Sequence, residues 1–357
     1  MRIGSILRWA WRDFASGQMQ AVLLIVAAAA VFGSLGAAEV LQVTAVNTEM
    51  MHYRDTASNV ILVTANKTVD GGACDRLSEL DSVQNSGGLR ERSPLVLHEL
   101  YGLSVAAYDV SPGFAELIAG SPITDSGVLI HDTLAEQLGL SAGSRLETPE
   151  GPIVIAGTYV WPSDGRDARL GFAVLVPTPT TSAFDECWLR EWPVSEDSGA
   201  LLRSTVITES QNADAAQIRQ ANPSNGTNAD FSGEFESRIS RFAWVGAAAF
   251  GLCVGLLWAR RRRVELCDGL AKGQSRSALL LQVAIEAGLV AVPALVLSGA
   301  ALGILSRIHS DDKQFFHELW LIAAVCPAAG SVSLILGSML GAASLRRASM
   351  YRYFRAR

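Results

Sequence analysis

The sequence predicts an α+β membrane protein with four transmembrane helices and a mixed α+β extracytoplasmic domain. Three observations support this prediction. Four long segments are almost free of charged residues, a polar segment at residues 45–238 separates the first of them from the second, and basic residues gather beside only some of the segment ends. The chain has 357 residues, of which 49% are hydrophobic and only 18% are charged, against about 25% charged in an average soluble domain.

The composition also excludes several classes of protein. The apolar content is too high for a disordered chain. The net charge of −6 leaves no basic excess to neutralise phosphates, so we expect no nucleic-acid partner. Five cysteines are too few for a small scaffold held together by disulfides.

The first 18 residues predict a cytoplasmic amphipathic helix. Apolar residues recur there at intervals of three and four, and Arg2, Arg8 and Arg12 fall on the other side. Such a helix, with Trp11 and Phe14 on its apolar side, suits the membrane interface.

The four apolar segments predict membrane spans at 19–44, 239–259, 278–305 and 319–345. Each approaches or exceeds the length of about 20 residues that a helix needs to cross the hydrocarbon core. One such segment could be a buried core helix, but four with charge clusters at their ends favour a membrane protein. The first could also be a cleaved signal peptide. Its apolar run is longer than usual for one, which favours a retained span.

The distribution of Lys and Arg predicts the orientation of the spans. Basic residues dominate the N-terminal segment, the segment at 260–277 and the tail at 346–357, whereas residues 46–237 contain 11 basic and 27 acidic residues. We therefore expect both termini and 260–277 in the cytoplasm. The large segment at 45–238 and the short loop at 306–318 then lie outside.

The extracytoplasmic segment has the pattern of a folded domain. Short strands are expected at 60–63, 105–108 and 128–130. A helix should follow over 132–139, capped by Asp132 or Thr133 and ended by Gly139. Beyond it, two strands at 143–148 and 153–158, joined by a Pro/Gly turn, predict a hairpin. Residues 195–232 are rich in Ser, Asn and Asp and predict loop and weakly ordered structure.

Two cysteines, Cys74 and Cys187, lie in this domain. An oxidising compartment would allow them to pair. We favour a disulfide over the alternative of two buried free thiols.

Motifs for catalysis are missing from the sequence. It has no Gly-x-x-x-x-Gly-Lys-Ser/Thr loop for ATP, no Gly-x-Ser-x-Gly and no His-Glu-x-x-His. The five histidines are scattered, so we expect no metal site. His52, next to Met50 and Met51, could contribute to a soft-ligand site, but such residues are common near an interface without a ligand. We expect neither a catalytic residue nor a cofactor in this chain.

The segment at 260–277 predicts a short exposed docking helix. Glu265 lies near its start and Gly273 at its end. The run Arg260 to Arg263 could be a topology determinant alone.

With these features the chain resembles the MacB/FtsX-like permeases of ABC transporters. They carry Arg-Arg-x-Glu-(Ile/Leu) after their second span, a glycine eight residues after the glutamate, and a glutamate in the third span. Glu265, Leu266, Gly273 and Glu286 match this pattern. Residues 127–160 resemble the family's external helix and hairpin, through Leu134, Ala135, Leu138, Gly139, Leu140, Gly143 and Ser144. In the segment after the second span, Gly269 and Lys272 depart from the family's pattern, which usually has apolar residues at these two positions.

The resemblance implies a mechanotransmitting permease with a MacB-like periplasmic domain in a bacterial cytoplasmic membrane. Two ABC ATPase subunits carrying ATP–Mg would bind it, with a second permease chain, either a copy or a sister. Arg263, Glu265, Leu266 and Gly273 would couple to the ATPase. Glu286 would face a partner span or the cytoplasmic interface, or else lie exposed to headgroups.

Three functions remain open on this basis. One is export or extraction of a hydrophobic or amphipathic substrate. Another is an FtsX-like regulator whose domain activates a cell-wall hydrolase, an extracytoplasmic partner protein. The third, a tethered sensor or adhesin, needs neither four spans nor a docking helix. The size of residues 45–238 favours transport.

Overall fold

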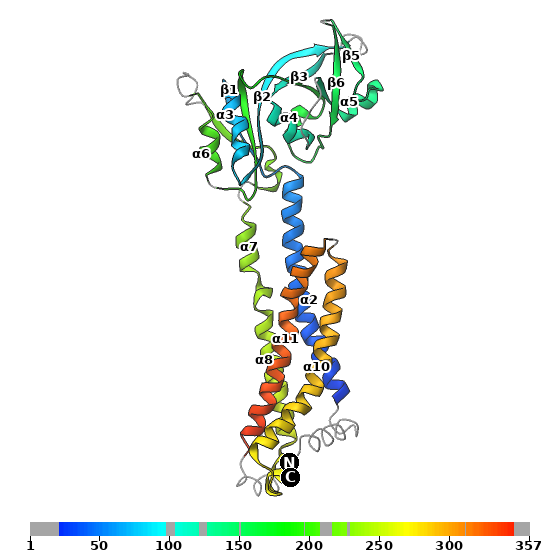
Figure 1. Cartoon of the computed structure of the whole chain (residues 1–357), viewed down its shortest axis with the longest axis vertical. Helices are drawn as coiled ribbons and strands as arrows, with labels where there is room; N and C mark the ends of the chain where they lie inside the picture. The colour runs from blue at the N-terminus through cyan, green and yellow to red at the C-terminus, as the bar shows by residue number, and fades with distance from the viewer. Residues whose placement is uncertain are drawn as a thin grey trace. The chain divides into compact units, whose positions relative to one another are not determined.

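A computed structural model describes residues 21–97, 104–120, 127–149, 151–195, 197–207, 216–226, 229–310 and 312–345 (Figure 1). The chain divides into two compact units, one formed by Met1–Thr48 with Asp230–Arg357 and the other by Glu49–Ala229. The amphipathic helix expected at 1–18 and the basic tail at 346–357 lie outside the described residues.

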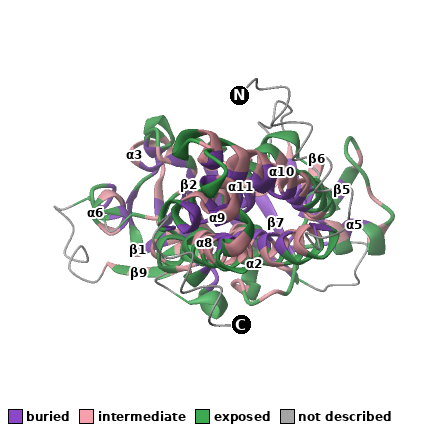
Figure 2. Cartoon of the chain, turned by 90° about the horizontal axis from the view of Figure 1, so that it is seen from below, coloured by how far each residue is buried: buried purple, intermediate pink, exposed green. Residues whose placement is uncertain are grey.

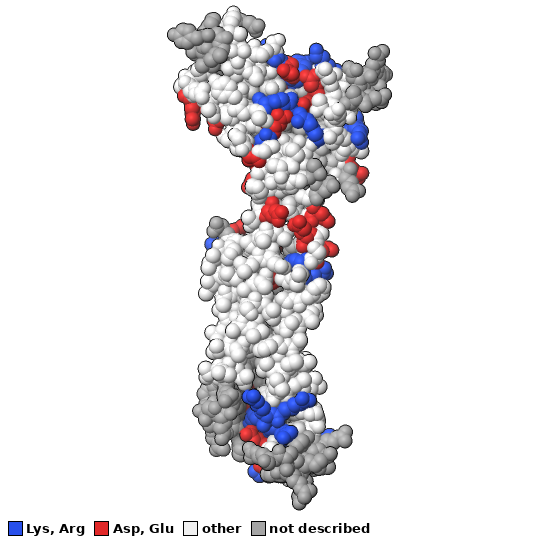
Figure 3. All heavy atoms as spheres, turned by 180° about the vertical axis from the view of Figure 1, so that it is seen from behind, with Lys and Arg blue, Asp and Glu red and all other residues white. Residues whose placement is uncertain are grey.

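The first unit is helical. Among its described residues, four helices are long and apolar enough to cross a membrane, at the four places that the sequence predicted. The described elements are α2 (Ala21–Asp55), α7 (Phe231–Ser237), η6 (Ile239–Phe242), α8 (Ala243–Arg261), α9 (Arg263–Ala271), α10 (Arg276–Ile308) and α11 (Lys313–Ala343). Helix α2 continues to Asp55, well past the expected end of the first span at residue 44. On the face drawn in Figure 3, the middle of this bundle carries no Lys, Arg, Asp or Glu.

Small residues set the closest helix contact in this unit. Ala247, Gly251, Gly255 and Ala259 recur every four residues along α8 and are all buried. This spacing places them on one helix face. A Cβ at Gly251 would overlap the carbonyl oxygen of Gly330 in α11, and one at Gly337 would overlap that of Leu252. Helices α8 and α11 therefore pack backbone against backbone, as small-xxx-small faces allow.

The described residues of the second unit form one mixed sheet of nine strands in the order β5-β6-β4-β7-β3-β2-β8-β1-β9. The pairs β3–β7 and β4–β6 are parallel and the others are antiparallel. The strands are β1 (Val60–Asp70), β2 (Val83–Val96), β3 (Ser104–Val110), β4 (Val128–His131), β5 (Arg145–Thr148), β6 (Gly151–Tyr159), β7 (Ala173–Pro177), β8 (Ala183–Glu191) and β9 (Gln217–Gln220).

Short helices connect these strands. They are α3 (Gly71–Arg76), η1 (Leu77–Glu79), α4 (Pro112–Ala119), α5 (Asp132–Leu138), η3 (Ala168–Leu170), α6 (Ser198–Arg203) and η5 (Pro223–Asn225). The predicted strands at 60–63, 105–108 and 128–130, the helix after them and the hairpin are present.

Two details of the prediction were wrong. The N-cap of α5 is His131, whose ring accepts from the backbone nitrogen of Thr133, rather than Asp132 or Thr133. Gly139 does end that helix in the left-handed region, with φ of 65°. The expectation of loop and weakly ordered structure over 195–232 was wrong for the described residues of α6, β9 and η5, and β9 pairs with β1 in the sheet.

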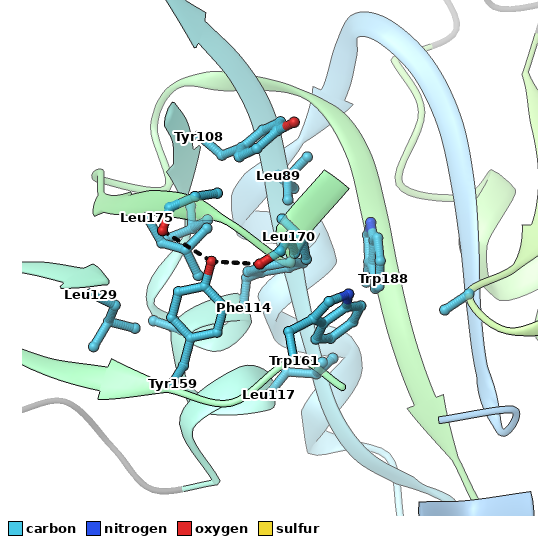
Figure 4. Close-up of a cluster of buried hydrophobic side chains, with 14 of the residues drawn as sticks. Leu89, Tyr108, Phe114, Leu117, Leu129, Tyr159, Trp161, Leu170, Leu175 and Trp188 are labelled. Carbon is cyan, nitrogen blue, oxygen red and sulfur yellow. Dashed lines mark hydrogen bonds between the residues drawn. The ribbon is translucent and has the colours of Figure 1, made fainter. Parts of the chain in front are cut away.

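Aromatic side chains fill the largest core of the second unit (Figure 4). The ring of Phe114 meets that of Trp188 edge to face, with centroids 5.4 Å apart. The Tyr159 hydroxyl lies 2.8 Å from the carbonyl oxygen of Leu170 and 3.1 Å from that of Ala173. Burial raises the pKa of this phenol, so it stays a hydrogen-bond donor.

Helix α3 is held to its neighbours by a disulfide and a half-buried carboxylate. The predicted disulfide between Cys74 and Cys187 is present and ties α3 to β8. Next to it, Asp75 accepts from the Ser111 hydroxyl at 2.5 Å and from the backbone nitrogen of Gly113 at 3.1 Å. Burial raises the pKa of Asp75, and these two hydrogen bonds offset only part of that effect.

Candidate functional site

The segment after the second span forms the short helix that the sequence predicted. Helix α8 ends at Arg261, and Arg262, with φ of −93° and ψ of 13°, separates it from α9. Glu265 lies in the first turn of α9, where a carboxylate is favoured by the helix dipole. Two residues after the helix, Gly273 has φ of 91°, a left-handed conformation in which glycine is favoured.

Helix α9 packs its apolar side on the end of the bundle (Figure 2). Leu266, Cys267 and Leu270 are buried against Leu279 and Val283 of α10, Ala342 of α11, and Leu345, two residues after α11. The predicted coupling residue Leu266 is therefore a packing residue. Burying it fixes α9 to the spans.

The polar side of this junction centres on Arg262. Its Nε donates to Glu265 at 2.8 Å, and its Nη1 donates to Glu286 of α10 at 2.5 Å. Its guanidinium also lies over the ring of Trp258, 5.1 Å from the centroid. One arginine thus joins the end of α8, the start of α9 and the third span.

Both oxygens of Glu286 are hydrogen-bonded within the chain. Oε2 accepts from Arg262, and Oε1 accepts from Gln282 at 2.9 Å. Gln282 in turn accepts from Gln274 at 3.0 Å, just after α9. Glu286 is fully buried, so the headgroup-exposed alternative is wrong for this residue. A buried carboxylate needs such partners, because an unpaired buried charge is costly.

The network also accounts for the departure at Gly269. A Cβ there would lie 2.6 Å from Oε1 of Gln274, and the backbone nitrogen of Gln274 donates to the Gly269 carbonyl at 3.1 Å. The glycine makes room for the glutamine that reaches Gln282. Lys272, the other departure, pairs with Asp268 at 2.5 Å on the exposed side of α9.

Sequence analysis named Glu265, Leu266, Gly273 and Glu286, but not the residue at the centre of this junction. The structure brings Glu265 and Glu286 together through a shared arginine, a contact that the sequence analysis did not predict. That arginine is Arg262, whereas the prediction named Arg263, which is exposed and whose coupling role stays a prediction. The spacing of three between Arg262 and Glu265 is the pattern that could have identified it.

A second buried ion pair lies elsewhere in the helical unit and was also missed. Glu39 of α2 pairs with Arg238, between α7 and η6, at 2.9 Å. The guanidinium lies 3.8 Å from the ring centroid of Phe235, and Gln42 accepts from the backbone nitrogen of Ser240 at 3.1 Å. These contacts fasten the first span to the segment that enters the second.

In the second unit, paired charges hold loops to the sheet. Arg169 and Arg219 each bridge Asp167 and Glu186, with distances of 2.8–3.2 Å. Burial alone would raise the pKa of Asp167, but hydrogen bonds and charge from Arg169, with Arg219, lower it. Each carboxylate is thus compensated by arginine. Among the described residues no three of His, Cys, Asp and Glu are grouped to hold a metal ion.

No protein-family model and no curated protein sequence matches this chain. Solved structures do match part of this chain. One is the periplasmic region of MacB from Actinobacillus actinomycetemcomitans, at 12% identity and a TM-score of 0.34, covering 49% of this chain and 94% of that one. Another is the extracellular domain of the ABC-type transporter YknZ from Gram-positive bacteria, at 10% identity and a TM-score of 0.32, covering 45% and 100%.

The order of elements along the chain is observed directly in the structure. One apolar helix precedes a mixed sheet domain, and three apolar helices follow it. This is the order of elements that the sequence predicted.

Proposed function

We propose that this chain is the membrane subunit of an ABC transporter, with α9 as its contact with the ATPase. The observation that carries the proposal is the Arg262 junction. It presents the Glu265 carboxylate, 61% exposed, on a short helix that is packed onto the spans. A carboxylate held this way suits a basic group on a partner.

The partners follow from this assignment. Two ATPase subunits would carry ATP–Mg, and a second permease chain, identical or a sister, would complete the membrane part. Both termini and α9 face the cytoplasm in this proposal, and the sheet domain lies outside the cytoplasmic membrane of a bacterium. ATP-driven movement at α9 would pass through the spans to the external domain, which exports or extracts a hydrophobic or amphipathic substrate.

The proposal is tested by recovering the tagged full chain from native membranes and measuring the ATP hydrolysis that accompanies it. We expect a P-loop ATPase with the wild type. Glu265→Ala should reduce the hydrolysis recovered per permease about tenfold, the usual size of coupling between two sites. Asp268→Ala is the matched control, because it removes another exposed carboxylate of α9 and should change hydrolysis little.

Two results would contradict the proposal. One is the absence of any P-loop ATPase from wild-type preparations, and the other is an equal effect of both substitutions. Recovery of a cell-wall hydrolase through the external domain, with the ATPase present, would favour the regulator function over transport.

A further inference from the structure

The two carboxylates that share Arg262 differ sharply in exposure. The Glu265 side chain is 61% exposed, whereas that of Glu286 is 0% exposed and that of Arg262 is 15% exposed. Water can replace Arg262 at Glu265 at little cost. Nothing can replace it at Glu286 without leaving a buried charge uncompensated.

The two halves of the junction are therefore not equivalent. Arg262–Glu286 must persist when the helices move, while Arg262–Glu265 can open. A basic side chain from a partner that binds Glu265 can take the place of Arg262 there. Arg262 keeps its ion pair with Glu286, and the Gln282–Gln274 hydrogen bonds hold the residues after α9 to the same face of α10.

From this asymmetry we propose that Arg262 is a positioning residue that makes the third span, α10, move with α9. This inference rests on the proposed function and names α10 as a second span, besides α8, that receives the movement of α9. In the bundle, Glu286 is the residue through which the movement of α9 passes to α10. The exposed Glu265 is the residue that contacts the partner. The link to α10 is through side chains 24 residues apart in sequence, in addition to the backbone that joins α9 to α8.

The test uses the full chain, recovered from native membranes with its ATPase. Three variants are compared: Glu286→Gln, the double variant Arg262→Gln with Glu286→Gln, and Arg261→Gln. The double variant removes both charges together, so it leaves no uncompensated buried ion. Arg261 is a matched control, since it is exposed in the last turn of α8 and its loss changes the charge of the same run by one.

We expect both Glu286 variants to recover as much ATPase as the wild type, with an unchanged KM for ATP. The kcat of the recovered complex should fall about tenfold, as for the loss of one coupling interaction. Arg261→Gln should match the wild type. A purely structural role for the pair would instead reduce the amount of folded permease or of ATPase recovered.

Wild-type kcat in the folded double variant would overturn this inference while leaving the proposed function intact. An unfolded double variant would also overturn it, because the pair would then be needed for folding rather than for coupling. Absence of an ATPase from wild-type membranes would instead contradict the proposed function itself.

Discussion

Asp75 makes the stability of the second unit depend on pH in an unusual direction. Its pKa is raised above 3.8 by burial, so the folded state holds its proton to higher pH than the unfolded state does. The contribution of protonated Asp75 to the stability of the folded state is therefore present below pH 3.8 and is lost as the pH rises through the raised pKa of Asp75. Asp167 has the opposite effect, because its pKa is lowered and its contribution is lost as pH falls.

The wild type should lose stability as the pH rises from about 4 through the raised pKa of Asp75. We expect the Asp75→Asn variant not to show this loss. The measurement is the thermal midpoint of the detergent-purified chain at several pH values, compared with the wild type. Asp81→Asn is the control, since Asp81 is exposed and should leave the pH profile unchanged. The assignment is wrong if wild type and Asp75→Asn keep parallel profiles.

The Cys74–Cys187 disulfide should be a large single contribution to the stability of its unit. It closes a loop with a sequence separation of 113. Removing a disulfide of this kind usually costs about 2–5 kcal/mol. We expect Cys187→Ala to lower the thermal midpoint and to remove the mobility difference between reduced and unreduced gels. Cys253→Ser, which changes a free cysteine, should preserve that difference. If the wild-type chain showed no mobility difference between reduced and unreduced gels, the pairing would be contradicted.

At the scale of elements, the α8–α11 contact should tolerate no added side chain. A Cβ at Gly255 would overlap the carbonyl oxygen of Leu334 and lie 2.7 Å from the backbone nitrogen of Ser338. Overpacking of this kind costs about 1–3 kcal/mol, so Gly255→Val should lower the thermal midpoint of the purified chain.

The matched control for Gly255 lies on α10. A Cβ at Gly288 meets nothing within 4 Å, so Gly288→Ala should be neutral or slightly stabilising. Equal losses from both substitutions would show that glycine content, rather than this contact, determines the effect.

The elements that sequence could predict are those with a local pattern. Four spans follow from length and apolar composition, and α9 follows from Glu265 and Gly273. Strand β2 carries no such pattern because Gly87 and Gly88 interrupt it. The structure explains them, since a Cβ at Gly87 would overlap the backbone of Phe114 and one at Gly88 would press on the ring of Phe184.

The same limit applies to β9 and to the centre of the candidate site. Strand β9 is polar, and its place depends on partners distant in sequence, such as Glu186 for Arg219. Four consecutive arginines look alike in sequence. Only the break between α8 and α9 turns Arg262, rather than its neighbours, toward Glu286.

At the scale of the whole molecule, the charge distribution predicts which parts share a compartment. Lys272 of the α9 segment, 75% exposed, should lie inside, and the exposed Glu136 of α5 should lie outside. We expect Glu136→Cys to react with a membrane-impermeant thiol reagent in intact spheroplasts. Lys272→Cys should react only after the membrane is opened.

This labelling is done in a background lacking the three free cysteines, Cys253, Cys267 and Cys326. Reaction of both positions in intact cells would contradict the orientation. The reverse pattern would place the sheet domain in the cytoplasm and exclude the proposed ATPase contact at α9.

The order of strands has a consequence for how the chain is made. β1, the first strand to be synthesised, lies between β8 and β9, which are synthesised last. The sheet cannot close, and Cys74 cannot meet Cys187, until nearly the whole domain has been synthesised. Helix α8 begins soon afterwards, at Ala243. Such non-local pairing folds slowly, so we expect the sheet to close at about the time that α8 is synthesised.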